Sequence, residues 1–352
     1  MRQGSRSLNR LVLLLLASLS GAGCGSSRPG VADAGGAGGS GGAGGGAGSI
    51  GGQCPSIGSG TSGDPNAAAT WSKSFTSSKW LGANSWTALT LTIAVDSAER
   101  VYLTDSDNIF QADASGVQKL YAKSSLDQDF GATAWGISAL DVSPEGRLFA
   151  LVDLSSSTFT TTLFAADASG HLRPFADFKP FWPFTTVISA VSSDYVLAPF
   201  DNLYCVTSNG MAALYGAIPA QYPAVSAWDT YGCSSRGITN EINGSYLYYL
   251  PGCNGSPLVG GRTDGTRVSE LWSPRNTSEV PSSNFWSLAR APRGGAIVNA
   301  GTTVFYVDEL EHVPLNITPA PVFEQCAVGV GLSSTLYFVC VGGDVYRVTP
   351  TP

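Results

Sequence analysis

The chain has 352 residues, of which 13% are charged, and its formal net charge at pH 7 is −7. Proteins that bind nucleic acid carry a basic face, so this acidic and weakly charged composition argues against nucleic acid as a partner. The 43 glycines are unevenly distributed, because 16 of them fall between residues 25 and 60. Residues 61–352 have an ordinary globular composition and are long enough to bury a large core.

The first 23 residues have the pattern of an export signal. Three arginines, Arg2, Arg6 and Arg10, precede an apolar run at residues 11–19. A helix needs roughly 20 apolar residues to cross a bilayer, so this run is too short to be a permanent anchor. Residues 1–23 are therefore expected to be a signal peptide that is removed during export.

Small residues lead directly into the first cysteine, in the order Gly21-Ala22-Gly23-Cys24. This stretch resembles the lipobox of bacterial lipoproteins. The resemblance implies that Cys24 is lipidated and becomes the new N-terminus. The alternative is ordinary cleavage after Ala22 or Gly23, which would release a soluble protein.

The cysteine count and the charge agree with a lipid anchor. The chain has seven cysteines, and lipidation of Cys24 would leave six that can pair, as an exported protein favours. The net charge of −7 becomes −10 when the three arginines of the signal are removed, so polybasic attraction to an anionic membrane is excluded. We therefore expect the bacterial cell envelope, at the outer membrane, with the lipid on Cys24 as the membrane contact.

Residues 24–60 form a Gly/Ala/Ser-rich segment with almost no apolar side chains to bury. Such a composition predicts a flexible tether and not a folded domain. About 30 residues of this kind have a mean end-to-end distance of roughly 30 Å, so the folded part could stand clear of the membrane.

Residues 61–352 are predicted to be an all-β domain built from repeats. Short runs of β-branched and aromatic residues alternate with Gly, Asn, Asp and Ser clusters. The segment at 110–116 recurs at 164–170, and the segment at 95–102 recurs at 142–149.

Looser copies of the repeat place equivalent residues 40 to 54 positions apart, at Phe110, Phe164, Tyr204, Leu258, Phe305 and Tyr346. This period is typical of a four-stranded propeller blade, so we expect a six-bladed β-propeller with four-stranded antiparallel blades. The last unit ends after its third strand. We expect the segment Trp71 to Phe75 to supply the missing outer strand and close the ring.

One repeat carries a family resemblance. Residues 93–105, Ile-Ala-Val-Asp-Ser-Ala-Glu-Arg-Val-Tyr-Leu-Thr-Asp, resemble an NHL-type repeat. This repeat builds six-bladed propellers that include gluconolactonase-like and senescence-marker-like enzymes. The resemblance implies the fold, and that fold hosts lactonases, lyases and binding modules alike. The Glu, Asn and Asp set that holds a divalent metal in gluconolactonase-like enzymes does not map onto this sequence.

The six remaining cysteines are predicted to form three disulfides. Cys233 and Cys253 fall nearly opposite each other around an Asn-Gly turn, and Cys326 and Cys340 do so around Ser333-Ser334. Cys54 and Cys205 then pair by elimination, although six cysteines allow fifteen connectivities.

No catalytic residue and no metal ligand is predicted. His171 and His312 both fall in hairpin turns, where a catalytic triad or a transition-metal site would be poorly placed. Asp105-Ser106-Asp107-Asn108 lacks the glycine and glutamate of a calcium loop and is predicted to be a tight turn.

Five tryptophans recur with the blades at spacings of 46 to 58, namely Trp86, Trp135, Trp182, Trp228 and Trp286, and Phe323 roughly continues the series. Most of them directly precede a predicted inner strand, on the face where propellers usually bind ligands. Their indoles are therefore candidate ligand contacts around the channel mouth. The alternative is packing between neighbouring blades, because repeated units bury repeated core residues.

The sequence predicts a lipid-anchored envelope propeller that acts as a ligand-binding or protein-scaffolding module. Its expected partners are the membrane, through the lipid, and a polysaccharide, a peptide or an envelope protein. The alternative is a metal-dependent lactonase or lyase that uses the axial channel. No cofactor is predicted for the binding module, and calcium is expected only under the enzymatic alternative.

Overall fold

The fold was described from a computed structural model of the chain. The structure describes residues 71–82, 92–105, 107–125, 133–155, 160–178, 188–199, 203–213, 237–240, 247–250, 260–263, 268–272, 287–292, 294–301, 303–307, 312–319, 323 and 325–351. The chain divides into the units Met1–Gly45 and Gly46–Pro352, and every described residue belongs to the second. The predicted signal peptide and tether therefore lie outside the described residues.

Five sheets each have four antiparallel strands that follow one another in chain order. We name them blades 1 to 5. Blade 1 comprises β2 (Ile93–Val95), β3 (Val101–Thr104), β4 (Asn108–Asp113) and β5 (Gly116–Ala122). Blade 2 comprises β6 (Thr133–Val142), β7 (Leu148–Ser155), β8 (Thr160–Ala166) and β9 (Leu172–Phe178). Blade 3 comprises β10 (Ser189–Ser192), β11 (Tyr195–Pro199), β12 (Leu203–Thr207) and β13 (Gly210–Ala213). Blade 4 comprises β14 (Gly237–Asn240), β15 (Leu247–Leu250), β16 (Gly260–Thr263) and β17 (Val268–Trp272). Blade 5 comprises β18 (Ser287–Arg290), β19 (Ala296–Asn299), β20 (Val304–Val307) and β21 (His312–Pro314).

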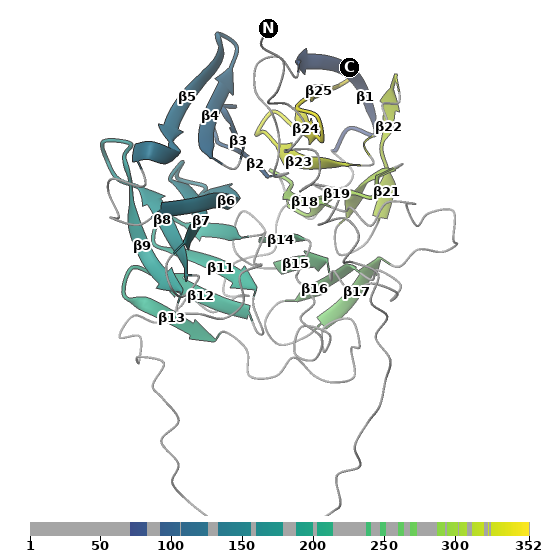
Figure 1. The fold of residues 1–352 in the computed structure, drawn as a ribbon. Coiled ribbons are helices and arrows are strands. Elements are labelled where there is room, and N and C mark those ends of the chain that lie inside the picture. The colour runs from purple at the N-terminus through teal and green to yellow at the C-terminus, as the bar shows by residue number, and fades with distance from the viewer. Residues whose placement is uncertain are drawn as a thin grey trace, which may run out of the picture. The chain divides into compact units, whose positions relative to one another are not determined.

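A further sheet joins the two ends of the described chain, and we name it the closing sheet. In spatial order it comprises β22 (Asn316–Thr318), β1 (Ser74–Leu81), β25 (Val345–Pro350), β24 (Leu336–Cys340) and β23 (Cys326–Val330). β1 pairs antiparallel with β25 and parallel with β22. Figure 1 shows β1 next to the C-terminal strands.

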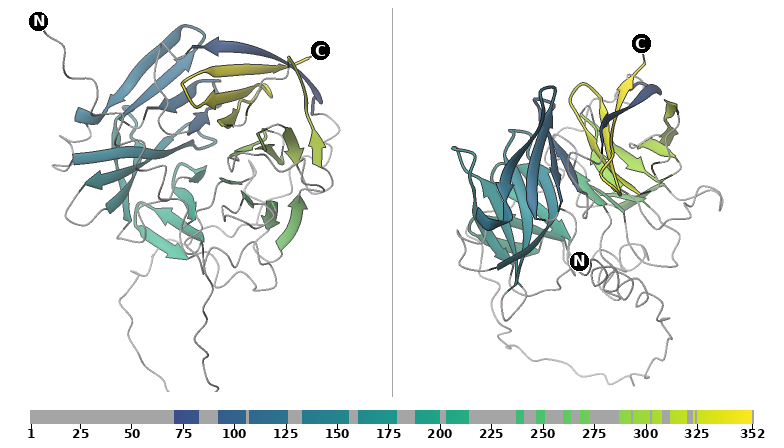
Figure 2. Two further views of the ribbon diagram at one scale, coloured as in Figure 1. Left: turned by 45° about the vertical axis from the view of Figure 1, so that its right-hand side comes forward. Right: turned by 45° about the horizontal axis from the view of Figure 1, so that its top comes forward.

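The first strands of the six sheets contact one another in a cycle. β2 contacts β6, β6 contacts β10, and the series continues through β14, β18 and β23 back to β2. In Figure 2 the sheets follow one another in this order, as their colours show. This arrangement of four-stranded antiparallel sheets is a β-propeller.

The predicted repeat anchors mark the third strands. Five of the six anchor residues lie in third strands, namely Phe110 in β4, Phe164 in β8, Tyr204 in β12, Phe305 in β20 and Tyr346 in β25. Leu258 lies outside the described residues, two positions before the third strand of blade 4. The repeat period therefore predicted the position of the third strand in five of the six sheets.

The prediction of six four-stranded antiparallel blades needs correction, because the structure shows five sheets of that form. Blades 1 to 5 have the predicted form, but the closing sheet has five strands and one parallel pair. The extra strand is β22, which covers the edge of β1 that would otherwise be left open. The predicted closing strand is present, but it runs over Ser74–Leu81 and not over Trp71 to Phe75.

The core lies between neighbouring sheets, because each strand sends alternate side chains to its two sides. In β3, Tyr102 packs in a cluster with side chains of blade 2, while Val101 and Leu103 pack in a cluster with side chains of the closing sheet. All four residues of β3 are buried, as are all four of β19 and β20. The second and third strands therefore read as almost continuous apolar runs.

Four of the hairpins between first and second strands share one turn. In each of them the first residue's N–H donates to the carbonyl of the fifth, and the fourth residue's N–H donates back to the first carbonyl. The fourth residue has a positive φ in each case, namely Glu99 (61°), Gly146 (89°), Gly294 (114°) and Ser334 (66°). This is the geometry of a type I turn followed by a left-handed residue.

Candidate functional site

A charge pair lies among the inner strands, at Asp141 in β6 and Arg290 in β18. Arg290 donates from Nη2 to the carbonyl oxygen of Ala190 in β10 at 2.9 Å, and the same nitrogen lies 3.9 Å from Oδ2 of Asp141. Asp141 Oδ2 accepts the N–H of Ala190 at 2.7 Å, and Oδ1 accepts the N–H of Val142 at 2.8 Å. Three blades thus contribute to one polar cluster. We name its two charged residues, Asp141 and Arg290, the axial pair.

Both charged residues depart from the repeat. The residue two positions before the shared turn is Ala94, Asp141, Ala289 or Gly329 in the four equivalent hairpins. The residue one position before it is Val95, Val142, Arg290 or Val330. The only charged residues in these eight positions are therefore Asp141 and Arg290, and they come together although they belong to different blades.

Burial shifts the ionisation of both groups. The Asp141 side chain is 24% exposed and the Arg290 side chain 15%. Burial raises the pKa of Asp141, and the positive charge of Arg290 and two backbone N–H groups act in the opposite direction. Burial lowers the pKa of Arg290, and the carboxylates of Asp141 and Glu145 oppose that shift. Each charge therefore favours the ionised form of the other.

Arg290 has one buried donor without an acceptor. Its Nε atom is buried and has no hydrogen-bond partner. Leaving a buried donor unpaired costs about 1–3 kcal/mol, so an oxygen acceptor that reached Nε would be bound favourably. The cluster therefore contains one unpaired donor on Arg290, enclosed by protein, and acceptor oxygens on Asp141 that each hold one backbone N–H.

Asp141 also belongs to a set of side chains that cap the inner strands. The hydroxyl of Thr92 accepts the N–H of Leu140 at 3.0 Å, and the hydroxyl of Ser287 accepts the N–H of Val328 at 3.0 Å. Each such bond joins one blade to the next and satisfies a backbone donor on an inner strand. Asp141 makes the corresponding bond to blade 3, but it does so with a charged group.

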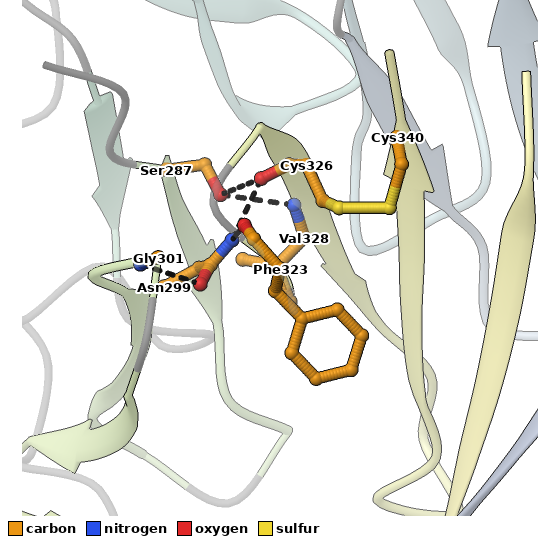
Figure 3. The surroundings of a disulfide bond; sticks show 7 residues. All are labelled: Ser287, Asn299, Gly301, Phe323, Cys326, Val328 and Cys340. Carbon is orange, nitrogen blue, oxygen red and sulfur yellow. Dashed lines mark hydrogen bonds between the residues drawn. A yellow bond between two sulfur atoms is a disulfide. The ribbon is translucent and has the colours of Figure 1, made fainter. Parts of the chain in front are cut away.

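A second polar network lies beside a disulfide, between blade 5 and the closing sheet (Figure 3). The carbonyl oxygen of Cys326 accepts a bond from Asn299 Nδ2 at 2.7 Å and one from the Ser287 hydroxyl at 3.3 Å. Asn299 also donates to the carbonyl of Phe323 at 3.1 Å and accepts the N–H of Gly301 at 3.0 Å. These groups are buried and saturated, so this network fastens the start of β23 and offers nothing to a ligand.

The side chains of the five predicted tryptophans all lie outside the described part of the structure. Trp86, Trp182, Trp228 and Trp286 lie outside the described residues, and Trp135 lies in β6 with only its backbone described. Phe323, which continues the series, is buried and stacks on Phe338 with ring centroids 3.8 Å apart. At Phe323 the side chain therefore packs between elements and does not face a ligand.

The predicted disulfide between Cys326 and Cys340 is confirmed. Cys326 and Cys340 lie opposite each other in β23 and β24 and form a disulfide. Cys205 is also disulfide-bonded, and its predicted partner Cys54 lies outside the described residues. Cys233 and Cys253 lie outside them too, as does Cys24.

The remaining candidates lie at hairpin ends. His171 is exposed in the turn between β8 and β9, where its Nδ1 lies 2.8 Å from the Ser169 hydroxyl, and His312 begins β21. Asp105 accepts the N–H groups of Asp107 and Asn108 at 3.0 and 2.7 Å, as predicted for a tight turn. Within the described part of the chain, His, Cys, Asp and Glu side chains form no group of three that could hold a metal ion.

The fold is similar to that of several solved structures. A catalytically inactive virginiamycin B lyase from Staphylococcus aureus, crystallised with quinupristin, matches with 12% identity and a TM-score of 0.50 over 78% of this chain and 99% of that one. A protein of unknown function from Bacteroides thetaiotaomicron matches with 10% identity and a TM-score of 0.50 over 78% of this chain and 75% of that one. A gluconolactonase from Xanthomonas campestris matches with 13% identity over 74% of this chain and 71% of that one, but its TM-score is 0.36.

These matches establish the propeller fold alone, because the sequence identities are low. No protein-family model matches the chain, and no curated protein does. Among the described residues, no helix is long and apolar enough to cross a membrane.

Proposed function

We propose that the protein is a lipid-anchored binding module of the bacterial cell envelope, built on a six-bladed propeller. We count the closing sheet as the sixth blade. Support comes from the cyclic contacts of the first strands and from β1, which fills the outer position next to β25. Cys24 would carry the lipid, and residues 24–60 would form the tether. A polysaccharide, a peptide or an envelope protein would be the ligand.

The axial pair supports binding over metal-dependent catalysis. A divalent cation needs several oxygen ligands of net negative charge, but here a guanidinium nitrogen lies 3.9 Å from the Asp141 carboxylate. At that distance the Arg290 charge would repel a metal held by Asp141. A site with a paired charge and one unpaired donor is suited to recognising a polar group.

The second candidate function is a metal-dependent lactonase or lyase that uses the axial channel. Its support is the fold shared with the virginiamycin B lyase. Calcium separates the two candidates, since an ion bound only by the folded state stabilises it, by about 2.7 kcal/mol at one hundred times its Kd. For the binding module we expect the same unfolding midpoint in urea with millimolar calcium chloride and with EDTA. A midpoint that rises with calcium and falls with EDTA would favour the hydrolase.

The binding role is tested with the complete chain and two arginine variants. We expect wild-type protein to retain one defined component of an envelope extract and Arg290→Gln to lose it. Arg347→Gln is the matched control, because Arg347 is exposed on β25 in the closing sheet, whereas the axial pair lies on β6 and β18. Equal capture by all three proteins would contradict a role for the axial pair.

Lipidation is tested separately by mass spectrometry of the mature N-terminus. We expect an acylated N-terminal peptide that begins at Cys24 and a protein that fractionates with membranes. A Cys24→Ser variant is expected to be found in the soluble fraction. An unmodified N-terminus at another residue would overturn the anchor and leave the propeller's binding role untouched.

A further inference from the structure

The axial pair spans the ring of first strands. In the cycle of contacts, β6 and β18 occupy opposite positions, and β10 and β14 lie between them on one side. Arg290 on β18 nevertheless donates to the carbonyl oxygen of Ala190 on β10 and lies 3.9 Å from the Asp141 carboxylate on β6. Its side chain therefore passes inside β14 and crosses the interior of the ring.

The pair takes the place of a neighbouring strand along the inner edge of β10. Among the described strands, β10 pairs with β11 alone, so its other edge faces the interior of the ring. On that edge Asp141 accepts the N–H of Ala190, and Arg290 donates to the C=O of the same residue. A paired strand would supply the same two bonds, one acceptor and one donor. Apolar side chains could not supply them.

This level of the ring is enclosed by protein. Ala190 is 0% exposed although it lies on the inner edge of β10, and the Nε atom of Arg290 is buried. Asp141 and Arg290 lie one or two positions before the turns that join first to second strands. A water-filled channel that continued past these turns would expose the strand edge and the side chains beside it. The enclosed level therefore lies at the turn end of the ring.

We propose that the axial pair closes the axial channel of the propeller at the end where the first strands turn into the second strands. A ligand that enters the channel must then do so from the opposite end. The closure itself goes beyond the proposed function. Its consequence for the ligand rests on that function and names the end of the ring from which the ligand approaches.

Capping of the inner strands does not by itself require an arginine. Thr92 and Ser287 satisfy N–H groups of a neighbouring first strand with short hydroxyl side chains. Arg290 instead bonds to β10, which is two positions away from β18 in the cycle. Only a long side chain reaches that far, and it places its bulk in the interior of the ring. Closure of the channel accounts for this bulk.

Hydrogen exchange of the complete chain tests the closure, with mass spectrometry and fragmentation to resolve single amides. The reporters are the N–H groups of Leu140 and Val328, because their acceptors are hydroxyl groups of neighbouring blades and not Arg290. The reference amides are those of β7 and β24, which pair with a strand on each side. In the wild-type protein we expect the two reporters to exchange as slowly as the reference amides.

An Arg290→Ala variant should open the closed end. We expect Leu140 and Val328 to exchange about tenfold faster or more, relative to the reference amides, because water then reaches the inner edges. Arg290→Met keeps the bulk and loses the charge, so it should change the two reporters less. Arg347→Ala is the matched control, since Arg347 is exposed on β25, and it should change neither reporter.

Two results would overturn the inference. Reporters that exchange much faster than the reference amides in the wild-type protein would show that the channel is open at this end, and this comparison needs no variant to fold. Reporters that keep their relative rates in Arg290→Ala would show that the arginine does not close the channel. Extract capture measures ligand binding independently, so failure of the closure and failure of the binding function can be distinguished.

Discussion

Glu99 adopts a backbone conformation that L residues avoid, with a φ of 61°. The same turn position holds glycine in blades 2 and 5, where this conformation costs little. At Glu99 the carboxylate accepts the backbone N–H of Ser333 at 2.7 Å and the hydroxyl of Tyr337 at 3.0 Å. Blade 1 is thereby fastened to the closing sheet, which offsets the strain at Glu99.

Substitutions of Glu99 separate these two effects. Glu99→Ala should lose both hydrogen bonds and keep the strain, whereas Glu99→Gly should lose the bonds and relieve the strain. We expect Glu99→Ala to be the less stable variant by about 1 kcal/mol, and both to be less stable than the wild-type protein. Urea unfolding measures this order. A Glu99→Ala protein as stable as the wild-type protein would mean that the bonds to the closing sheet contribute nothing.

Three tyrosines predict the alkaline limit of stability. Burial is the largest cause that raises the pKa of Tyr102, Tyr195 and Tyr337 to about 12, from an ordinary value of 10.0. The folded state therefore holds these protons more tightly than the unfolded state does. Their contribution to stability is complete below pH 10 and is lost as the pH rises from 10 to 12.

A Tyr195→Phe variant should lose less stability over that pH range than the wild-type protein. The measurement is urea unfolding at pH 9 and at pH 11, combined with the ultraviolet absorbance of ionised tyrosine. If the wild-type protein were equally stable at both pH values, the tyrosines would titrate normally in the folded state.

At the scale of the element, the turns between strands require glycine for two different reasons. Gly170, in the turn between β8 and β9, has a φ of 84°, and a Cβ atom added there would meet no other atom within 4 Å. Gly295, which ends the turn before β19, has a φ of 76°, and an added Cβ would lie 2.6 Å from the carbonyl oxygen of Val307. The first glycine is needed for its backbone conformation alone, and the second for conformation and space.

Alanine at these two glycines should therefore have unequal effects. We expect Gly170→Ala to lower the free energy of unfolding by about 1–2 kcal/mol through backbone strain alone. Gly295→Ala should lower it further, by roughly another 1–3 kcal/mol, because the crowded backbone must move. Urea unfolding of the two variants measures the difference, and equal losses would contradict the steric part of the explanation.

At the scale of the whole molecule, the closing sheet holds together segments from both ends of the folded chain. Phe75 in β1 pairs with Pro350 in β25, and Ser77 pairs with Val348. Trp71, just before β1, stacks on Tyr306 of blade 5 with ring centroids 5.3 Å apart. Without β1, both β25 and β22 would present open edges.

Removal of β1 should therefore cause association. A chain that lacks residues 1–82 is expected to form oligomers or aggregates, whereas a chain that lacks only residues 1–60 should stay monomeric. Light scattering after size-exclusion chromatography distinguishes the two. A monomeric and cooperatively folding protein without β1 would show that the closing strand is dispensable.

The sequence predicted the features that the repeat controls. Strands recur at Phe110 and Phe164 because the same turn residues follow both, and Cys326 pairs with Cys340 because the hairpin register places them opposite each other. The closing strand was expected a few residues too early, because β1 is an outer strand whose exposed positions carry serine, threonine and lysine. The three-residue β22 is too short to leave a periodic pattern.

The axial pair could not be predicted in the same way. Asp141 and Arg290 lie in different blades and meet only when the inner strands gather. A signal nevertheless exists, because these residues replace the alanine or glycine and the valine found at the equivalent positions of the other hairpins. In a repeat protein, a charged residue at a position that is otherwise small and apolar identifies a candidate site.

The pairing of β1 with β25 also determines how the domain would respond to mechanical force. Tension that arrives along the chain from residues before Trp71 enters the fold through β1, whose main-chain bonds to β25 run from Phe75 to Leu81. Because Phe75 at the start of β1 pairs with Pro350 at the end of β25, tension between the two ends of the folded chain would open these bonds one after another from the Phe75 end. A single-molecule pulling experiment should record a first rupture that releases β1 before the remaining blades unravel.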